Sequence, residues 1–246
     1  FDPLARTCKF MLTEEAHHLF VGETGLDRVI RRSSELTKLD PNEDARAQGG
    51  IDLDTIQKWI NYWYPYCLDL FGAEVSSNAA HYFASGLKGR WHEARSYEDH
   101  SALGQFKQMD LMENNVLATK DIPLRNAMNE LLREDYMKDC VRALTKWNAS
   151  IKSHDLDFQL KLPHHRFFRR QGAYANHHFD LDGHQITKEA FDLLLVESLP
   201  SVEDRAYVKS LMKPVLEPGK IANWISPPKR GINKQGFDFQ YIRTDT

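Results

Sequence analysis

The stretch LTEEAHHLF, residues 12–20, contains two overlapping Glu-x-x-His pairs. Glu14 precedes His17 by three positions, and Glu15 precedes His18 by three positions. Residues three apart in an α-helix lie on the same face, so each pair can present a carboxylate and an imidazole together. Helical bundles that hold two metal ions use this i, i+3 arrangement. The stretch therefore raises the hypothesis of a metal centre and leaves open which pair would serve it.

A helical wheel separates the two pairs. Glu15 and His18 lie on the more apolar face, together with Cys8, Met11, Leu12, Leu19, Gly22, Leu26 and Val29. Glu14 and His17 lie on a more polar flank, together with Thr7, Phe10, Val21, Thr24, Arg28 and Arg31. Burying a carboxylate is unfavourable unless it is paired or binds a metal. We therefore expect Glu15 and His18 to face the core, either as metal ligands or as hydrogen-bonded core residues, while an ordinary i, i+3 helix contact is the alternative for any such pair.

The surrounding sequence predicts a mainly α fold. Apolar residues at helical spacing predict long helices over about residues 1–38, 52–72 and 123–150, and shorter ones over about 74–87, 188–199 and 202–212. Asp121 is a candidate cap for the helix near residue 123, and Asp182-Gly183 predicts a short hairpin. We expect a helical bundle portion over residues 1–160 and an irregular, loop-rich C-terminal segment with short helices over 161–246.

Composition excludes several classes of protein. The chain has 246 residues, is 41% hydrophobic and carries a net charge of -3, so general binding to nucleic acid or to an acidic membrane is not expected. No apolar run approaches the roughly 20 residues that a membrane span needs. Three cysteines without a Cys-x-x-Cys spacing argue against a disulfide framework and a zinc ribbon, and favour a cytoplasmic location.

The segment after residue 160 gathers histidines and basic residues. The histidines are either a zinc site or part of a solvated loop, and the second interpretation is favoured because no Cys or His-x-His completes a tetrahedral set; they are His164, His165, His177, His178 and His184. The basic residues are either ordinary surface charge or a site for a phosphorylated ligand; they are Arg166, Arg169, Arg170, Lys220, Lys229 and Arg230.

With these residues described, the chain resembles a known family. FDPLARTCKFMLTEEAHHLFVGETG, residues 1–25, is similar to the second metal-ligand helix of the oxygenase component of benzoyl-CoA 2,3-epoxidases, and this is the most specific part of the likeness. ASGLKGRWHE (84–93), PHHRF (163–167) and EPGKIANWISPP (217–228) support it. The resemblance extends over essentially the whole chain, which would correspond to the C-terminal half of the family's proteins.

The resemblance implies a ferritin-like di-iron helical bundle. The family pattern Glu-Glu-x-x-His makes the second Glu the ligand, so Glu15 and His18 would hold iron, as the wheel also favours. The family's two irons activate O2 with electrons that a flavin and iron–sulfur reductase takes from NADPH, and one oxygen atom epoxidises the aromatic ring of benzoyl-CoA. Arg166, Arg169, Arg170 and Lys220 would then be candidates to bind the CoA phosphates.

The start of the sequence raises a further expectation. The first residue is Phe1 rather than Met, and the Glu-x-x-His helix begins almost at once, so we expect an N-terminally truncated fragment. No other Glu or Asp has a His three positions on, so the remaining iron ligands would lie upstream and the fragment alone would be inactive. The alternatives are a metal-free helical binding module related to the oxygenase, or an oxygenase for another aryl-CoA.

Overall fold

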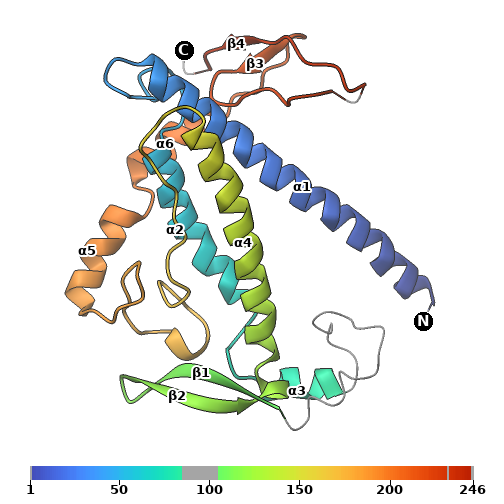
Figure 1. Ribbon diagram of the computed structural model, residues 1–246, viewed down its shortest axis with the longest axis vertical. Helices are drawn as coiled ribbons and strands as arrows, with labels where there is room; N and C mark the ends of the chain where they lie inside the picture. Colours follow the sequence, from blue (N-terminus) through green and yellow to red (C-terminus); the bar gives the residue numbers. More distant parts are fainter. Residues whose placement is uncertain (1, 85–104, 232, 245–246) are drawn as a thin grey trace. The chain divides into compact units, whose positions relative to one another are not determined.

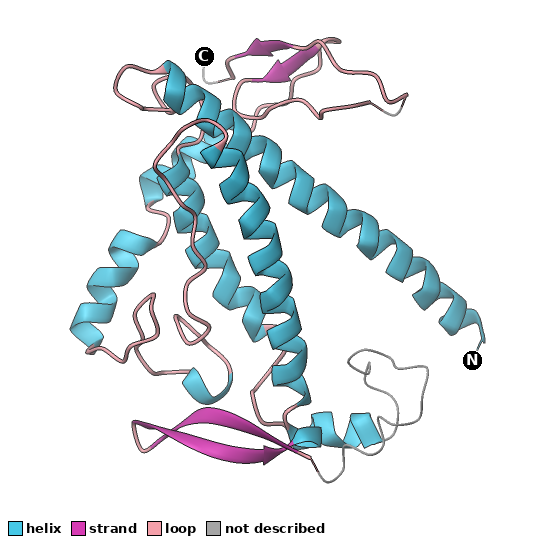
Figure 2. Ribbon diagram, viewed as in Figure 1, coloured by secondary structure: helices cyan, strands magenta, loops and turns pink. Residues whose placement is uncertain are grey.

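Helices dominate the structure, as the sequence predicts. The computed structural model describes residues 2–84, 105–231 and 233–244. Figure 2 shows helices as the main elements, with only short paired strands. The elements in chain order are α1 (Asp2–Leu39), α2 (Leu53–Asp69), α3 (Ser77–Ala84), β1 (Phe106–Glu113), β2 (Val116–Pro123), the 3-10 turn η2 (Leu124–Asn126), α4 (Met128–Lys152), the 3-10 turn η3 (Gly172–Tyr174), α5 (Lys188–Ser198), α6 (Val202–Leu211), β3 (Lys220–Ala222) and β4 (Gln240–Ile242) (Figure 1).

The chain forms two compact units that interleave in sequence. Unit 1 contains residues 1–57, 143–161 and 200–246, and unit 2 contains residues 58–142 and 162–199. The helices α2 and α4 each contribute residues to both units. The predicted division into a bundle portion over 1–160 and a C-terminal segment over 161–246 stays a prediction.

In unit 1, the second half of α1 packs against the loop that follows it. Ile30 and Leu36 on the helix are buried, as are Ala45 and Ile51 in and after the loop. Gly50 allows the close approach, because a Cβ at this position would overlap Leu36 Cδ1 and lie 3.2 Å from the Ala45 carbonyl oxygen. This loop is the polar Pro- and Gly-containing segment that separates the first two predicted helices.

Arg46 ties three parts of unit 1 together. Its guanidinium donates to Asp52, which precedes α2, to the Thr55 hydroxyl and to Asp204 on α6. Asp52 also accepts a hydrogen bond of 2.7 Å from the Thr55 amide, in the manner of a helix cap. Asp204 belongs to the capping box that Ser201 begins at the start of α6. One arginine therefore links the starts of two helices.

The C-terminal tail of unit 1 is anchored on α1. The strands β3 and β4 are parallel, with Ile221 paired to Tyr241. Arg32 on α1 donates to the Asn223 carbonyl oxygen at 2.9 Å, and its guanidinium carbon lies 3.7 Å from the centre of the Tyr241 ring. These contacts give the Pro- and Gly-rich tail a defined path that its sequence did not predict.

Unit 2 contains a β-hairpin that the sequence interpretation missed. The strands β1 and β2 pair antiparallel, and Asn114 and Asn115 form the turn with φ of 48° and 63°. Asparagine tolerates this left-handed conformation better than most residues. Asp121 lies within β2, paired with Gln108, so the expectation that it caps a helix was wrong. The long helix expected from about residue 123, α4, begins only at Met128, after the 3-10 turn η2.

Other predicted elements in both units were confirmed. Of the helix expected at 74–87, residues 77–84 form α3 and residues 74–76 are not helical, while most of ASGLKGRWHE lies outside the described residues. Asp182-Gly183 does form a turn between bridged residues Phe179 and Gln185, and Gly183 has a φ of 88°. The short helices α5 and α6 match the predictions to within a residue. No helix in the described ranges is both long and apolar enough to cross a membrane.

Candidate functional site

Glu15 and His18 lie next to each other on consecutive turns of α1. His18 Nδ1 is 3.6 Å from Glu15 Oε2, and the two side chains are 64% and 65% exposed. The exposure leaves ligand-forming atoms of both side chains accessible. A carboxylate oxygen and an imidazole nitrogen at this separation are compatible with two ligands on one edge of an iron centre.

The expectation that these two residues face a core was wrong for the described part of the chain. Every residue from Asp2 to Gly22 is exposed, including Leu12 and Leu19 on the same apolar face. Glu14 and His17 are exposed as well. No segment among the described residues covers the apolar face that the wheel predicts. Burial therefore does not distinguish the Glu15–His18 pair from the Glu14–His17 pair in this structure.

The four basic residues predicted to bind CoA phosphates all have protein partners. Arg166 pairs with Asp110 at 2.7 Å, and Lys220 in the other unit pairs with Glu217. The guanidinium carbon of Arg170 lies 3.3 Å from the centre of the Tyr66 ring and 4.1 Å from that of Phe168. Their assignment to a phosphate site stays a prediction.

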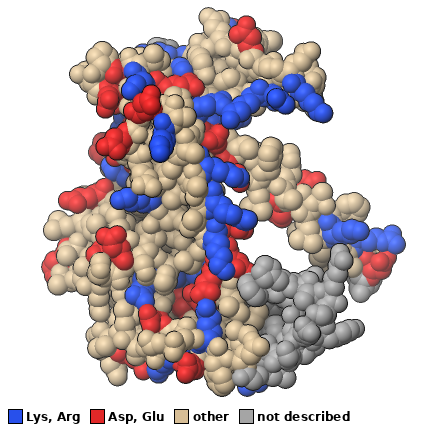
Figure 3. Space-filling view, in the orientation of Figure 1, with Lys and Arg blue, Asp and Glu red and all other residues tan. Residues whose placement is uncertain are grey.

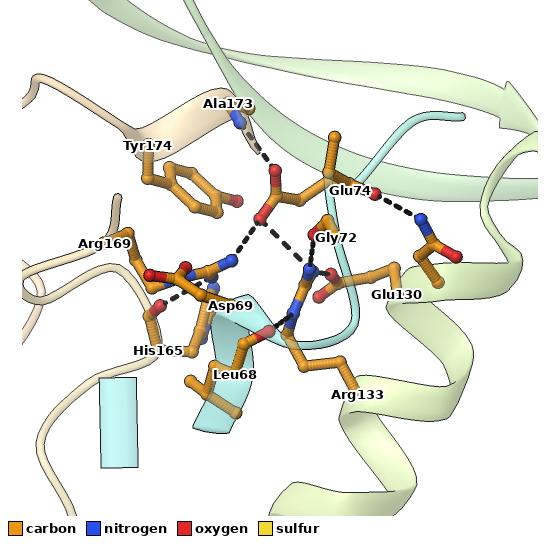
Figure 4. Close-up of polar contacts among 12 residues, drawn as sticks. Leu68, Asp69, Gly72, Glu74, Glu130, Arg133, His165, Arg169, Ala173 and Tyr174 are labelled. Atoms are coloured by element: carbon orange, nitrogen blue, oxygen red, sulfur yellow. Dashed lines mark hydrogen bonds and ion pairs between the residues drawn. The ribbon is translucent and has the colours of Figure 1, made fainter. Parts of the chain in front are cut away.

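Arg169 differs from the other three because its side chain is completely buried. Its Nε donates to Asp69 Oδ1 at 2.5 Å, and its Nη2 lies 3.1 Å from Glu74 Oε1. Figure 4 shows that it belongs to a buried network with Glu74, Glu130 and Arg133. In this arrangement Arg169 stabilises the packing of residues 162–175 on α2 rather than reaching solvent.

The centre of this buried network is Arg133 on α4. Its guanidinium pairs with Glu130 one turn earlier and with Glu74, and it donates to the carbonyl oxygens of Leu68 and Gly72 at the end of α2. Burial raises the pKa of Glu130, and the Arg133 charge opposes that rise. The i, i+3 spacing of Glu130 and Arg133 was visible in the sequence, but their burial was not.

Gly172 makes room for the Glu74 carboxylate in this network. The residue has a φ of 81°, and a Cβ on it would overlap Glu74 Oε2. The next amide, that of Ala173, donates to the same oxygen at 2.5 Å. Glu74 therefore receives hydrogen bonds from a backbone turn as well as charge from the arginines.

Of the five histidines considered for a zinc site, His184 alone belongs to a metal-compatible group among the described residues. His164 and His165 have ring centroids 4.2 Å apart, and burial together with nearby positive charge lowers the pKa of His165 to about 3. The one metal-compatible group within the described residues is Asp180, Asp182 and His184, and it is largely exposed. His184 Nδ1 lies 3.2 Å from Asp180 Oδ2, so the group also functions as part of the Asp-Gly turn.

Comparison with known proteins gives the family context for these residues. No family model matches the chain. The chain is 47% identical to "Benzoyl-CoA oxygenase component B" of Aromatoleum evansii over 247 aligned positions, which include 99% of this chain and 52% of that protein. The relative is about twice as long as this chain. This length is consistent with the prediction that the chain corresponds to half of a longer protein. The predicted resemblance is thus confirmed: this chain is a relative of a benzoyl-CoA oxygenase component and spans about half of that protein's length.

Proposed function

We propose that the chain is part of a di-iron monooxygenase that epoxidises the aromatic ring of benzoyl-CoA. The observation that carries the proposal is the Glu15–His18 pair, within a chain that is 47% identical to a benzoyl-CoA oxygenase component. In this proposal the chain contributes some of the iron ligands of the active site and some of the helices of a ferritin-like bundle.

Glu15 and His18 hold one edge of the iron centre in this proposal. Their accessible oxygen and nitrogen atoms fit hard metal ligands. The other ligands come from the part of the protein that corresponds to the unmatched half of the relative, and the same part covers the apolar residues of α1 around the pair. When bound, the two irons supply the O2 activation that ring epoxidation requires. The residues on this face keep water from the centre once they are covered.

The electrons come from a separate reductase in this proposal. Epoxidation of the ring uses one oxygen atom of O2 and releases the other as water, so it consumes two electrons and two protons. A flavin and iron–sulfur reductase takes these electrons from NADPH, and the reaction takes place in the cytoplasm.

Metal analysis of four variants of the full-length protein tests the assignment. The unmodified protein is expected to hold close to two irons per polypeptide. Glu15→Ala and His18→Ala are each expected to remove most of that iron, because each deletes a ligand. Glu14→Ala and His17→Ala are matched controls on the same turns of α1 and should retain it. Equal loss in all four variants would contradict the choice of pair.

Substrate assays separate the proposed function from its alternatives. With the reductase and NADPH, the full-length protein should convert benzoyl-CoA faster than phenylacetyl-CoA. The reverse preference would identify an oxygenase for another aryl-CoA. Absence of both iron and turnover would identify a metal-free binding module.

A further inference from the structure

A cavity of about 510 Å³ lies within unit 1. Its walls include Glu23, Asp27 and Arg31 of α1, Lys146 and Trp147 of α4, and Lys229 of the C-terminal tail. Cavities of about 300–1,000 Å³ are typical of sites for small molecules. Its lining residues include neither Glu15 nor His18.

Backbone contacts hold the tail against this part of α1. Arg28 Nε donates to the Ser226 carbonyl oxygen at 2.6 Å, and the Ser226 amide donates to the Arg28 carbonyl oxygen at 3.1 Å. Arg31 Nη2 donates to the Pro227 carbonyl oxygen at 2.6 Å. Because Lys229 follows two residues later, these contacts bring its ammonium group to the cavity. Figure 3 shows Lys and Arg side chains along the edge of the tail that faces α1.

The opposite wall is fixed by Glu23. Lys146 Nζ lies 2.5 Å from Glu23 Oε1, and Trp147 Nε1 donates to the Glu23 carbonyl oxygen at 3.3 Å. The indole ring is therefore held in one orientation beside the cavity. A fixed aromatic ring beside cationic groups can stack on a planar base.

The charges of the wall do not balance. Lys146 is paired with Glu23. The other charged residues that line the cavity are two cations, Arg31 and Lys229, and one anion, Asp27. Arg31 uses Nη2 on Pro227, and its Nε lies 3.9 Å from Glu35, so the guanidinium keeps further donors for a ligand. Lys229 is exposed and makes no ion pair with a described residue. Burial first, and then the Arg31 charge, lower the pKa of the neighbouring Arg28.

We propose that this cavity binds the phosphorylated nucleotide end of an acyl-CoA, with Arg31 and Lys229 on phosphate oxygens and the adenine against Trp147. Asp27 accepts hydrogen bonds from a ribose hydroxyl or from the adenine amino group. The proposal rests on the proposed function, which supplies the acyl-CoA, and it adds where that molecule is recognised. A nucleotide is more complementary to the lining residues than an acidic peptide is, because the cavity is small and offers one aromatic surface.

Calorimetric titration of the full-length protein with adenosine 3′,5′-bisphosphate tests the proposal, and CoA and inorganic phosphate serve as further probes. Lys229→Ala and Arg31→Gln are each expected to weaken binding of the bisphosphate and of CoA about tenfold, which is the typical effect of losing one charge-assisted hydrogen bond. Lys229→Ala changes an exposed side chain that forms no ion pair with any residue in the described ranges, so it should not disturb folding. Lys209→Ala, an exposed lysine on α6, is the matched control and should bind normally.

Two further arms separate the competing explanations. Inorganic phosphate should bind far more weakly than the bisphosphate, and equal binding would show a simple anion site and overturn the nucleotide assignment. Unchanged affinity in Lys229→Ala and Arg31→Gln, with weaker binding in Arg166→Gln or Lys220→Ala, would also overturn it. Either result leaves benzoyl-CoA turnover of the unmodified protein intact, so failure of this inference differs from failure of the proposed function.

Discussion

Glu74 and Arg133 form an ion pair that is completely closed to solvent, with Glu74 Oε1 3.2 Å from Arg133 Nη1. Asp69, Glu130 and Arg169 complete the network around them (Figure 4). Buried charges are tolerated only when each has partners, so removal of one member leaves the others uncompensated. The network joins the end of α2, the start of α4 and the loop before η3 within unit 2.

Replacing Arg133 with Met should destabilise the protein by about 3 kcal/mol or more, because the buried carboxylates of Glu74 and Glu130 lose their shared partner. Urea denaturation measures the change in the free energy of unfolding. Arg142→Met is the matched control, since Arg142 lies on the same helix and forms an i, i+3 pair with Asp139 that is well exposed. The control should change stability little. A similar decrease in the free energy of unfolding in both variants would show that the buried network stabilises the protein no more than an exposed ion pair does.

Replacing Gly172 with Ala should destabilise the protein more than the same change at Gly219. Both glycines have positive φ, 81° and 74°, so both substitutions introduce backbone strain of about 1 kcal/mol. At Gly172 the new Cβ would also displace the Glu74 carboxylate, whereas at Gly219 it meets no atom within 4 Å. Thermal unfolding of the two variants measures the difference. An equal decrease in thermal stability for both variants would mean that the Glu74 carboxylate can move at no cost in free energy.

Stability should fall as the pH is lowered from about 6.5 toward 3, and His165 should account for part of the fall. Burial first, and then the charges of His164, Arg166, Arg169 and Arg133, lower the pKa of His165 to about 3. The unfolded chain, with an ordinary histidine pKa near 6.5, binds a proton across this range that the folded chain does not. One such group reduces the free energy of unfolding by up to about 1.4 kcal/mol per pH unit.

The variant His165→Gln isolates this contribution from those of other groups. The raised pKa of Glu130 acts in the opposite direction, because its folded form retains a proton that the unfolded chain releases. Unfolding experiments between pH 7 and 4 should therefore give a shallower pH dependence for His165→Gln than for the unmodified protein. Parallel curves would show that His165 titrates normally in the folded state.

The sequence by itself determined the helical class and the lengths of most helices. The helix expected over about 1–38 matches α1, and the short helices expected near 188–199 and 202–212 match α5 and α6. These elements follow from local apolar periodicity, which needs no distant contact. The hairpin over residues 106–123 was missed because its signal is a brief alternation around two asparagines, and Asp121 at its end resembled a helix cap.

The sequence also identified the Glu15–His18 pair and the relationship to a benzoyl-CoA oxygenase component, because both depend on local spacing and residue identity. Only the tertiary structure decided which charges are buried. Arg166, Arg169 and Arg170 look equivalent in the sequence, yet Arg169 alone among them is fully enclosed between Asp69 and Glu74. The physical reason is that burial and pairing depend on residues about 100 positions away, whereas helix formation depends on neighbours within a turn or two.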